Sequence, residues 1–235
     1  MRNRNLQSEL MDDPAIDPDV HRAALRGLAR VNTISDAATP IARAIRKRLL
    51  DVDIVPERLS VLDVATGSGD LPIRLARLLE TPGCALEFHA CDISRTALET
   101  TRERSERAGV PISTHAVDIL ADPLPEADVV TCALFMHHLT EEQAVRALVA
   151  MSRAARRLLV ISDLRRSWPA LVMVAAATRL VTRSRVVHVD AVRSVQGSFT
   201  SPELAHLADR AGLVTASIRP IRPARMLLCW QADDE

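Results

Sequence analysis

The sequence contains no tyrosine, and it has only three phenylalanines and two tryptophans among its 235 residues. Aromatic side chains are the platforms on which proteins stack unpaired bases, so their scarcity disfavours a nucleic-acid-binding protein. The charge agrees, because 30 acidic residues balance 30 basic ones and no net positive charge is left to attract phosphates. We therefore expect no nucleic-acid partner.

The sequence also lacks paired cysteines and long apolar runs. Its four cysteines form no CxxC pair, which is typical of reduced thiols in the cytosol. The first residues contain no apolar signal core. The most apolar run, 168–181, contains Arg179 and is too short to cross a bilayer. These absences predict a soluble, cytoplasmic protein without stable membrane insertion.

What the sequence does have is a hydrophobic fraction of 48%, enough for a sizeable core. From about Ser60, short apolar runs alternate with amphipathic helical patterns, as in a parallel sheet covered on both faces. The expected strands are 61–64, 86–91, 112–117, 129–134, 158–162, 214–218 and 226–230. The pattern predicts an α/β fold: a Rossmann-like, doubly wound, mostly parallel seven-stranded sheet with helices on both faces.

Local signals mark several helix ends. Asp70 and Ser94 are expected to cap helices, and Gly109 ends the second of these. Thr140 and Gln143 have the spacing of a capping box. A further helix is expected to open at Ser201-Pro202 and to close at Gly212.

Two segments fall outside the alternation. Residues 18–50 have the pattern of two amphipathic helices around a break at 32–35. Residues 164–199 form an insertion with a helix near 168–182 and a polar stretch at 188–198. We divide the chain into an N-terminal helical extension, 1–58, and a main domain, 59–235, in which 164–199 forms a helical lid. A homodimer interface is the alternative use of the insertion.

A glycine-rich turn follows the first expected strand. The strand ends at Val64, and Ala65-Thr66-Gly67-Ser68-Gly69 leads directly to a helix. Glycine lets a ligand approach the backbone, and the N–H groups of a helix start can bind a carboxylate or a phosphate. A dinucleotide or another nucleoside would fit. The third glycine of the dinucleotide fingerprint is missing, because Pro72 stands in its place.

Two further strand ends carry an acid followed by an isoleucine. Asp92 lies where a carboxylate can accept hydrogen bonds from a ribose diol, and Ile93 offers an apolar wall to a purine. Asp118 could accept a hydrogen bond from an adenine amino group, with Ile119 beside it. Together with the glycine turn, these strand ends predict a nucleoside pocket.

The segment VLDVATGSGD, residues 61–70, resembles class I S-adenosylmethionine-dependent methyltransferases, especially the ubiquinone/menaquinone C-methyltransferase branch. Most class I members have glycine where this chain has Ala65. The resemblance covers residues 59–162 well and 200–230 in pattern. With this core, Leu10-Met11-Asp12-Asp13-Pro14 is also similar to bacterial methyltransferases associated with type III polyketide synthases. The resemblance implies a methyltransferase whose 59–235 domain binds S-adenosyl-L-methionine and methylates a small, apolar aromatic acceptor: a phenol, a quinone-like compound or a polyketide.

The resemblance also assigns the parts of the cofactor pocket. Asp92 would hold the ribose, Asp118 would meet the adenine amino group, and Leu134 would offer its carbonyl to the cofactor ammonium. The residues that would enclose the methionine end are Asp63, Ala65, Thr66, Gly67 and Gly69, and those that would enclose the adenine are Ile93 and Ile119.

Methyl transfer from a sulfonium is an in-line displacement, so the protein mainly supplies alignment and a dry pocket. A phenol or carbon acid also benefits from a base, and histidine titrates near neutral pH. The candidate catalytic residues are therefore His137, His138 and His188. Each could instead be a hydrogen-bonded pocket wall, and phenol methylation can proceed without a base.

His137, His138 and Glu141 could suggest a metal site, but we expect no bound metal. The adjacent histidines are expected to point in different directions, and no third ligand is evident. Two other functions stay open. One is a nicotinamide-dependent Rossmann oxidoreductase, which the missing third glycine disfavours. The other is a non-catalytic methyltransferase-like binding protein, which the acids at Asp63, Asp92 and Asp118 disfavour.

Overall fold

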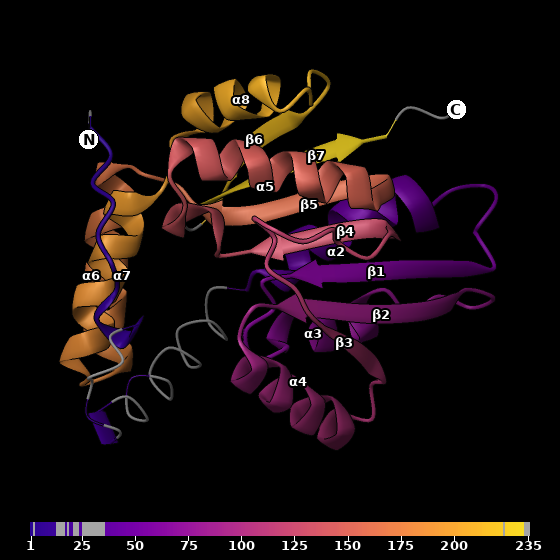
Figure 1. Cartoon of the computed structure of the whole chain (residues 1–235), viewed down its shortest axis with the longest axis horizontal. Coiled ribbons are helices and arrows are strands. Elements are labelled where there is room, and N and C mark those ends of the chain that lie inside the picture. Colours follow the sequence, from indigo (N-terminus) through magenta and orange to yellow (C-terminus); the bar gives the residue numbers. More distant parts are fainter. Residues whose placement is uncertain are drawn as a thin grey trace.

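The centre of the molecule is a seven-stranded sheet in the order β3-β2-β1-β4-β5-β7-β6 (Figure 1). This computed structural model describes residues 1, 3–12, 17, 19–20, 24, 36–222 and 224–232. The strands are β1 (Arg58–Val64), β2 (Ala85–Asp92), β3 (Ile112–Ala116), β4 (Ala127–Ala133), β5 (Ala155–Leu164), β6 (Ser217–Ile221) and β7 (Arg225–Gln231). The first five strands are parallel to one another, and β7 is antiparallel to both β5 and β6. The predicted fold class is confirmed.

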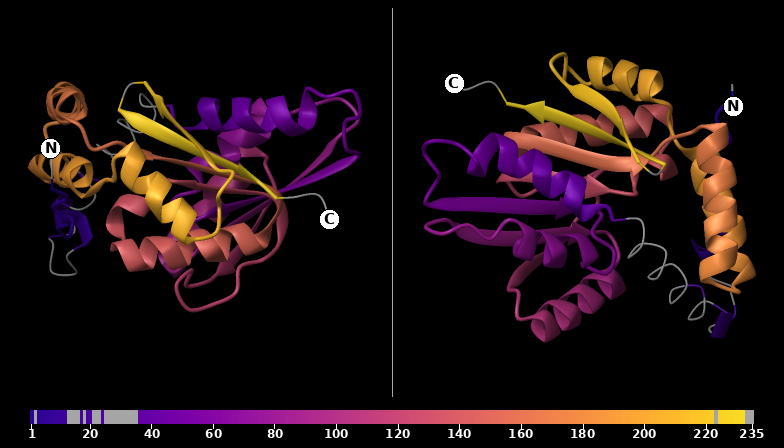
Figure 2. Two further views of the ribbon diagram at one scale, coloured as in Figure 1. Left: turned by 90° about the horizontal axis from the view of Figure 1, so that it is seen from above. Right: turned by 180° about the vertical axis from the view of Figure 1, so that it is seen from behind.

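Helices cover both faces of this sheet (Figure 2). The helices are α2 (Ala38–Ile45), which continues as a π-helical turn, η2 (Arg46–Leu50), α3 (Asp70–Leu78), α4 (Arg95–Ala108), α5 (Glu141–Ala154), α6 (Trp168–Val181), α7 (Arg185–Gly197) and α8 (Ser201–Arg210). Two short 3-10 turns complete them: η1 (Leu10–Asp12) and η3 (Met136–His138). None of the helices described is long and apolar enough to cross a membrane.

The near-continuous apolar character of β1 follows from this layering. Its residues Leu59 and Val61 pack with α2 and α3, whereas Leu62 and Val64 pack with α5 and α8. Because both faces are covered, six of the seven residues of β1 are buried. This arrangement holds the end of β1 rigidly at the sheet edge where the glycine turn begins.

Most predicted helix ends are confirmed. The Ser94 hydroxyl accepts the Ala97 N–H at 3.3 Å, Gly109 ends α4 with φ +66°, and Thr140 forms its capping box with Gln143.

One predicted cap is wrong. Gly69, with φ +73°, is the residue before α3, and the Asp70 side chain caps nothing. Instead, Arg104 and Ser68 bind the Asp70 carboxylate. The predicted strand 214–218 also starts later, at Ser217, because residues 213–216 form a turn closed by an Ala216 N–H to Leu213 carbonyl bond of 2.9 Å.

The insertion forms two packed helices. The expected helix near 168–182 is α6, and the polar stretch 188–198 lies in a second helix, α7, that we did not predict. Both lie across the edge at which the parallel strands end (Figure 1). At the N-terminus, α2 and η2 fall within the expected helical region 18–50, whereas the expected break at 32–35 lies outside the described residues. The domain division at residue 58 stays a prediction.

Candidate functional site

The glycine turn after β1 has the backbone that its sequence suggests. Ala65, Gly67 and Gly69 all have left-handed conformations, with φ of 53°, 58° and 73°. A Cβ on Gly69 would lie 2.7 Å from the Thr101 side chain, so α4 presses directly on this turn. A Cβ on Gly67 would meet nothing within 4 Å. The turn thus packs against α4 on one side and is open on the other, as a binding site for a nucleoside requires.

Asp92, at the end of β2, faces this turn. Its Oδ2 accepts the Gly67 N–H at 2.9 Å and its Oδ1 accepts the Ser94 N–H at 2.9 Å. A carboxylate has about four acceptor positions, so both oxygens keep capacity for a ribose diol. The next side chain, Ile93, is 70% exposed, which is unusual for a large apolar residue and leaves its surface free to contact a base.

The end of β3 lies beside the end of β2. Asp118 Oδ1 accepts the Leu120 N–H at 2.9 Å and organises the turn after β3. Ile119 is half-buried against the core. Because β3, β2, β1 and β4 are consecutive neighbours in the sheet, the ends that carry these residues share one edge.

Asp63 lies just inside that edge and is only 2% exposed. Burial raises its pKa to about 7 and the Asp92 charge adds to this, although hydrogen bonds from Thr66 and Thr131 oppose the rise. Those hydroxyls donate to the Asp63 carboxylate at 2.7 and 3.0 Å. Proteins place such perturbed carboxylates at functional sites more often than elsewhere.

Leu134 follows β4 and is held in a left-handed conformation, with φ +57°. Its N–H donates to the Ser162 carbonyl at 3.0 Å, which fixes the turn against β5. Left-handed backbone is costly for a residue with a side chain. Leu134 and Ala65 thus place two such strained residues at the ends of the adjacent strands β4 and β1. All ten predicted cofactor residues lie on these neighbouring strand ends and turns, and their roles stay predictions.

The histidines behind Leu134 are differently placed. His137 is buried in η3, where its Nδ1 and its backbone N–H bond the two oxygens of Asp163 at 2.7 and 3.0 Å. Burial works to lower the pKa of His137, but the charge and hydrogen bond of Asp163, together with Glu9, raise it above its usual range. The same pairing lowers the pKa of Asp163. The buried carboxylate therefore fixes the ring and directs Nε2 away from itself.

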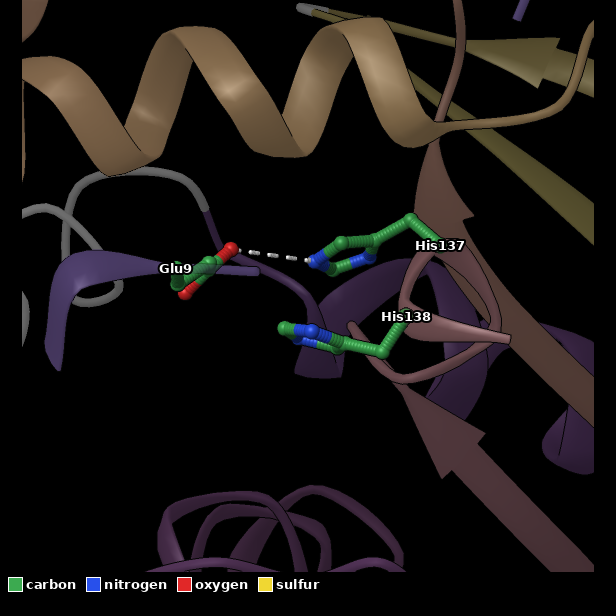
Figure 3. Close-up of side chains that lie close together, drawn as sticks. All are labelled: Glu9, His137 and His138. Atoms are coloured by element: carbon green, nitrogen blue, oxygen red, sulfur yellow. Dashed lines mark ion pairs between the residues drawn. The ribbon is translucent and has the colours of Figure 1, made fainter. Parts of the chain in front are cut away.

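The expectation that His137 and His138 diverge is wrong. Their ring centroids are 4.2 Å apart with an interplanar angle of 35°. Both rings extend from η3 toward Glu9 (Figure 3). The third candidate, His188, does not join them through Nε2, because that nitrogen bonds the Thr182 carbonyl at 2.8 Å.

Glu9 was not predicted as part of any site. It belongs to an N-terminal strap, residues 3–12, that runs along α7 (Figure 1). Asp190 accepts the N–H groups of Leu10 and Met11 at 2.7 and 3.1 Å, and Ser194 bonds the Glu9 carboxylate. Glu9 Oε1 thereby lies 3.8 Å from His137 Nε2.

The sequence contains a pattern that could have identified Asp163, but none that could have identified Glu9. Asp163 follows an expected strand, as Asp92 and Asp118 do, so the same reasoning could have found it. Glu9 has no such signal, because only the path of the folded chain brings it to His137. The absence of a third ligand, on which the expectation of no metal rested, is also corrected, because Glu9 offers one.

Comparisons with known proteins support a methyltransferase, the class of protein suggested by the residues at this edge of the sheet. Residues 61–157 match the model of a methyltransferase domain family. The ubiquinone/menaquinone biosynthesis C-methyltransferase UbiE of Azotobacter vinelandii is 33% identical over 106 residues, which is 43% of this chain and 41% of that protein. The present chain thus matches less than half the length of that relative.

Solved structures share the fold. The S-adenosylmethionine-dependent methyltransferase SibL superposes with a TM-score of 0.69 at 18% identity, covering 97% of this chain and 63% of that one. The plantazolicin methyltransferase BpumL, solved in complex with a pentazolic desmethylPZN analogue and S-adenosylhomocysteine, gives a TM-score of 0.67 at 14% identity, covering 93% of this chain and 92% of that one.

The fold is therefore the Rossmann-like α/β fold that solved methyltransferases share. More particularly, residues 61–157 match a methyltransferase domain family, and part of the chain is distantly similar to the UbiE C-methyltransferases.

Proposed function

We propose that this protein transfers the methyl group of S-adenosylmethionine to a small, apolar aromatic acceptor such as a phenol, a quinone-like ring or a polyketide. One observation carries the proposal. The open glycine turn, Asp92 and the strained residues Ala65 and Leu134 meet at one sheet edge inside a matched methyltransferase domain. Backbone strain of this kind is retained where a ligand needs it.

The residues present suit the cofactor. Asp92 would accept the ribose hydroxyls, and the exposed Ile93 would contact one face of the adenine. The left-handed Leu134 would present its carbonyl to the ammonium group, with the Asp63 carboxylate nearby. When bound, the cofactor supplies a methyl group already activated on a sulfonium, so the chain itself has to align the reactants and exclude water.

The acceptor would enter beside His137 and His138. Of the three candidate histidines, His137 is the one that a buried carboxylate holds in a single orientation. Helix α6 lies at the same edge and exposes Trp168, Val172 and Leu180, which favours an apolar acceptor. The quinone named for the UbiE relative is of that chemical class. Proton transfer by these histidines, a homodimer and a cytoplasmic location stay predictions.

Calorimetric titration of the whole chain with S-adenosylhomocysteine tests the cofactor, with NADH in parallel. We expect micromolar binding of the former alone. Asp92→Ala should weaken it about 10- to 150-fold, corresponding to about 1.5–3 kcal/mol for lost bonds to a charged acceptor. Asp209→Ala, which removes an exposed carboxylate from α8, is the matched control and should bind normally.

Circular dichroism separates lost binding from lost folding, because Asp92 also bonds the turn. Binding of NADH alone would replace the proposal by the oxidoreductase reading. Tight S-adenosylhomocysteine binding with no transfer of labelled methyl to a panel of phenols and quinols would instead indicate a non-catalytic relative.

A further inference from the structure

We infer that Glu9, His137 and His138 form a binding site for a divalent first-row transition-metal ion such as zinc. Ion binding follows from the geometry of these three side chains. Only the role of the ion in the reaction, described below, rests on the proposed function.

The donor atoms already converge. One ligand atom from each side chain lies within 4.8 Å of the other two, and Glu9 Oε1 is 3.8 Å from His137 Nε2. All three side chains point into the same space from two separate segments (Figure 3). When two ligand atoms each lie about 2.0–2.2 Å from a zinc ion, they are about 3–3.5 Å apart. Side-chain rotations that move the ligand atoms by roughly 1 Å would therefore complete the site. His138, which is exposed, has the room to make such a movement.

Hydrogen bonds hold the ligand side chains in place on both sides of the site. The Asp163 carboxylate bonds His137 Nδ1 at 2.7 Å, which leaves Nε2 as the nitrogen that faces Glu9. A histidine ligand backed by a carboxylate in this manner is the usual arrangement at protein metal sites. On the other side, Ser194 bonds Glu9, and Asp190 holds the two N–H groups that follow it.

The charge around the cluster favours a cation. Glu9 and Asp163 are two largely buried carboxylates on opposite sides of one imidazole, with side chains 11% and 2% exposed. The charge of the buried Arg225 attracts that of Asp163, and Arg4 donates a hydrogen bond to the His137 carbonyl at 3.0 Å. A divalent ion at that point would bind two neutral nitrogens and one carboxylate, a donor set that suits zinc and its neighbours.

Three protein ligands leave coordination positions open, as in catalytic rather than structural metal sites. In the proposed reaction an acceptor oxygen would occupy such a position. The ion would lower the pKa of that hydroxyl, whose proton goes to water as the oxygen–methyl bond forms and the sulfonium–methyl bond breaks. Because a metal would use His137 Nε2, this role and proton acceptance by the same nitrogen exclude one another.

The test titrates the chelator-treated whole chain with Zn²⁺ by calorimetry and with Co²⁺ by visible absorption. We expect one ion per chain at micromolar affinity and the intense bands of low-coordinate Co²⁺. Glu9→Gln and His138→Ala should each weaken binding at least tenfold and change the Co²⁺ spectrum. His206→Ala and Glu142→Gln, which alter exposed side chains of α8 and α5, are the matched controls and should leave both unchanged.

Millimolar affinity in the wild-type chain would overturn the inference. So would micromolar binding that Glu9→Gln and His138→Ala leave intact, since the ion would then lie elsewhere. Circular dichroism of every variant reports whether it is folded. Titration with S-adenosylhomocysteine separates the two proposals: a folded chain that binds this ligand but no zinc contradicts only the metal site, and the reverse contradicts only the cofactor.

Discussion

At the scale of single residues, Asp63 links ionisation to stability. Its folded pKa is about 7, against about 3.9 for an unfolded aspartate, because burial disfavours the charge. Between pH 4 and 7 the folded chain therefore keeps a proton that the unfolded chain has lost. The free energy of unfolding must fall as the pH rises through that window, and this loss is complete above about pH 7.

Asp63→Asn should remove this pH dependence. An amide can still bond the hydroxyls of Thr66 and Thr131 but cannot ionise. Relative to wild type, we expect the variant to gain about 1–3 kcal/mol in free energy of unfolding between pH 4 and pH 8. Urea unfolding at both pH values measures it, with Asp209→Asn as the exposed control. An equal difference between variant and wild type at the two pH values would show that Asp63 ionises normally in the fold.

At the scale of elements, the strap of residues 3–12 depends on α7. Asp190 is only 4% exposed and accepts two consecutive N–H groups of the strap, those of Leu10 and Met11. Arg193 adds a bond of 2.7 Å to the Ser8 carbonyl. These contacts determine where Glu9 lies.

Asp190→Ala should release the strap while leaving the sheet folded. Loss of two hydrogen bonds to a charged acceptor predicts at least tenfold faster amide exchange at Leu10 and Met11, measured by hydrogen–deuterium exchange. Exchange in β1 and β4 should not change, because the core clusters do not include the strap. Unaltered exchange at Leu10 and Met11 would mean that other contacts hold the segment.

The same scale explains what the sequence could predict. The strands were found because helices on both faces demand near-continuous apolar runs, and the caps at Ser94 and Thr140 were found because they are local. Helix α7 was missed because only a few of its residues, such as Val187 and Val195, are buried. The divergence of His137 and His138 was predicted wrongly, because the 3-10 turn that brings their rings together has no signature in the sequence. Glu9 depends on a contact between distant segments, which periodicity does not encode.

At the scale of the whole molecule, the predicted cofactor pocket would be assembled from turns that follow four separate strands, β1 to β4. A ligand that contacts all of them binds the folded chain and not the unfolded one. S-adenosylhomocysteine at 100 times its Kd should therefore stabilise the protein by about 2.7 kcal/mol. For a chain of this size that corresponds to a rise in Tm of about 5–10 °C, measurable by scanning fluorimetry.

The variant Asp92→Ala shows whether that rise comes from the predicted pocket. At the same ligand concentration its weaker affinity should reduce the rise in Tm to about half or less, since stabilisation grows only with the logarithm of ligand over Kd. NADH should give no rise with either protein. A rise of the same size in wild type and variant would mean that the ligand binds away from the β2 end. The strand-end geometry would then describe a fold without its expected pocket, even though the methyltransferase domain match would stand.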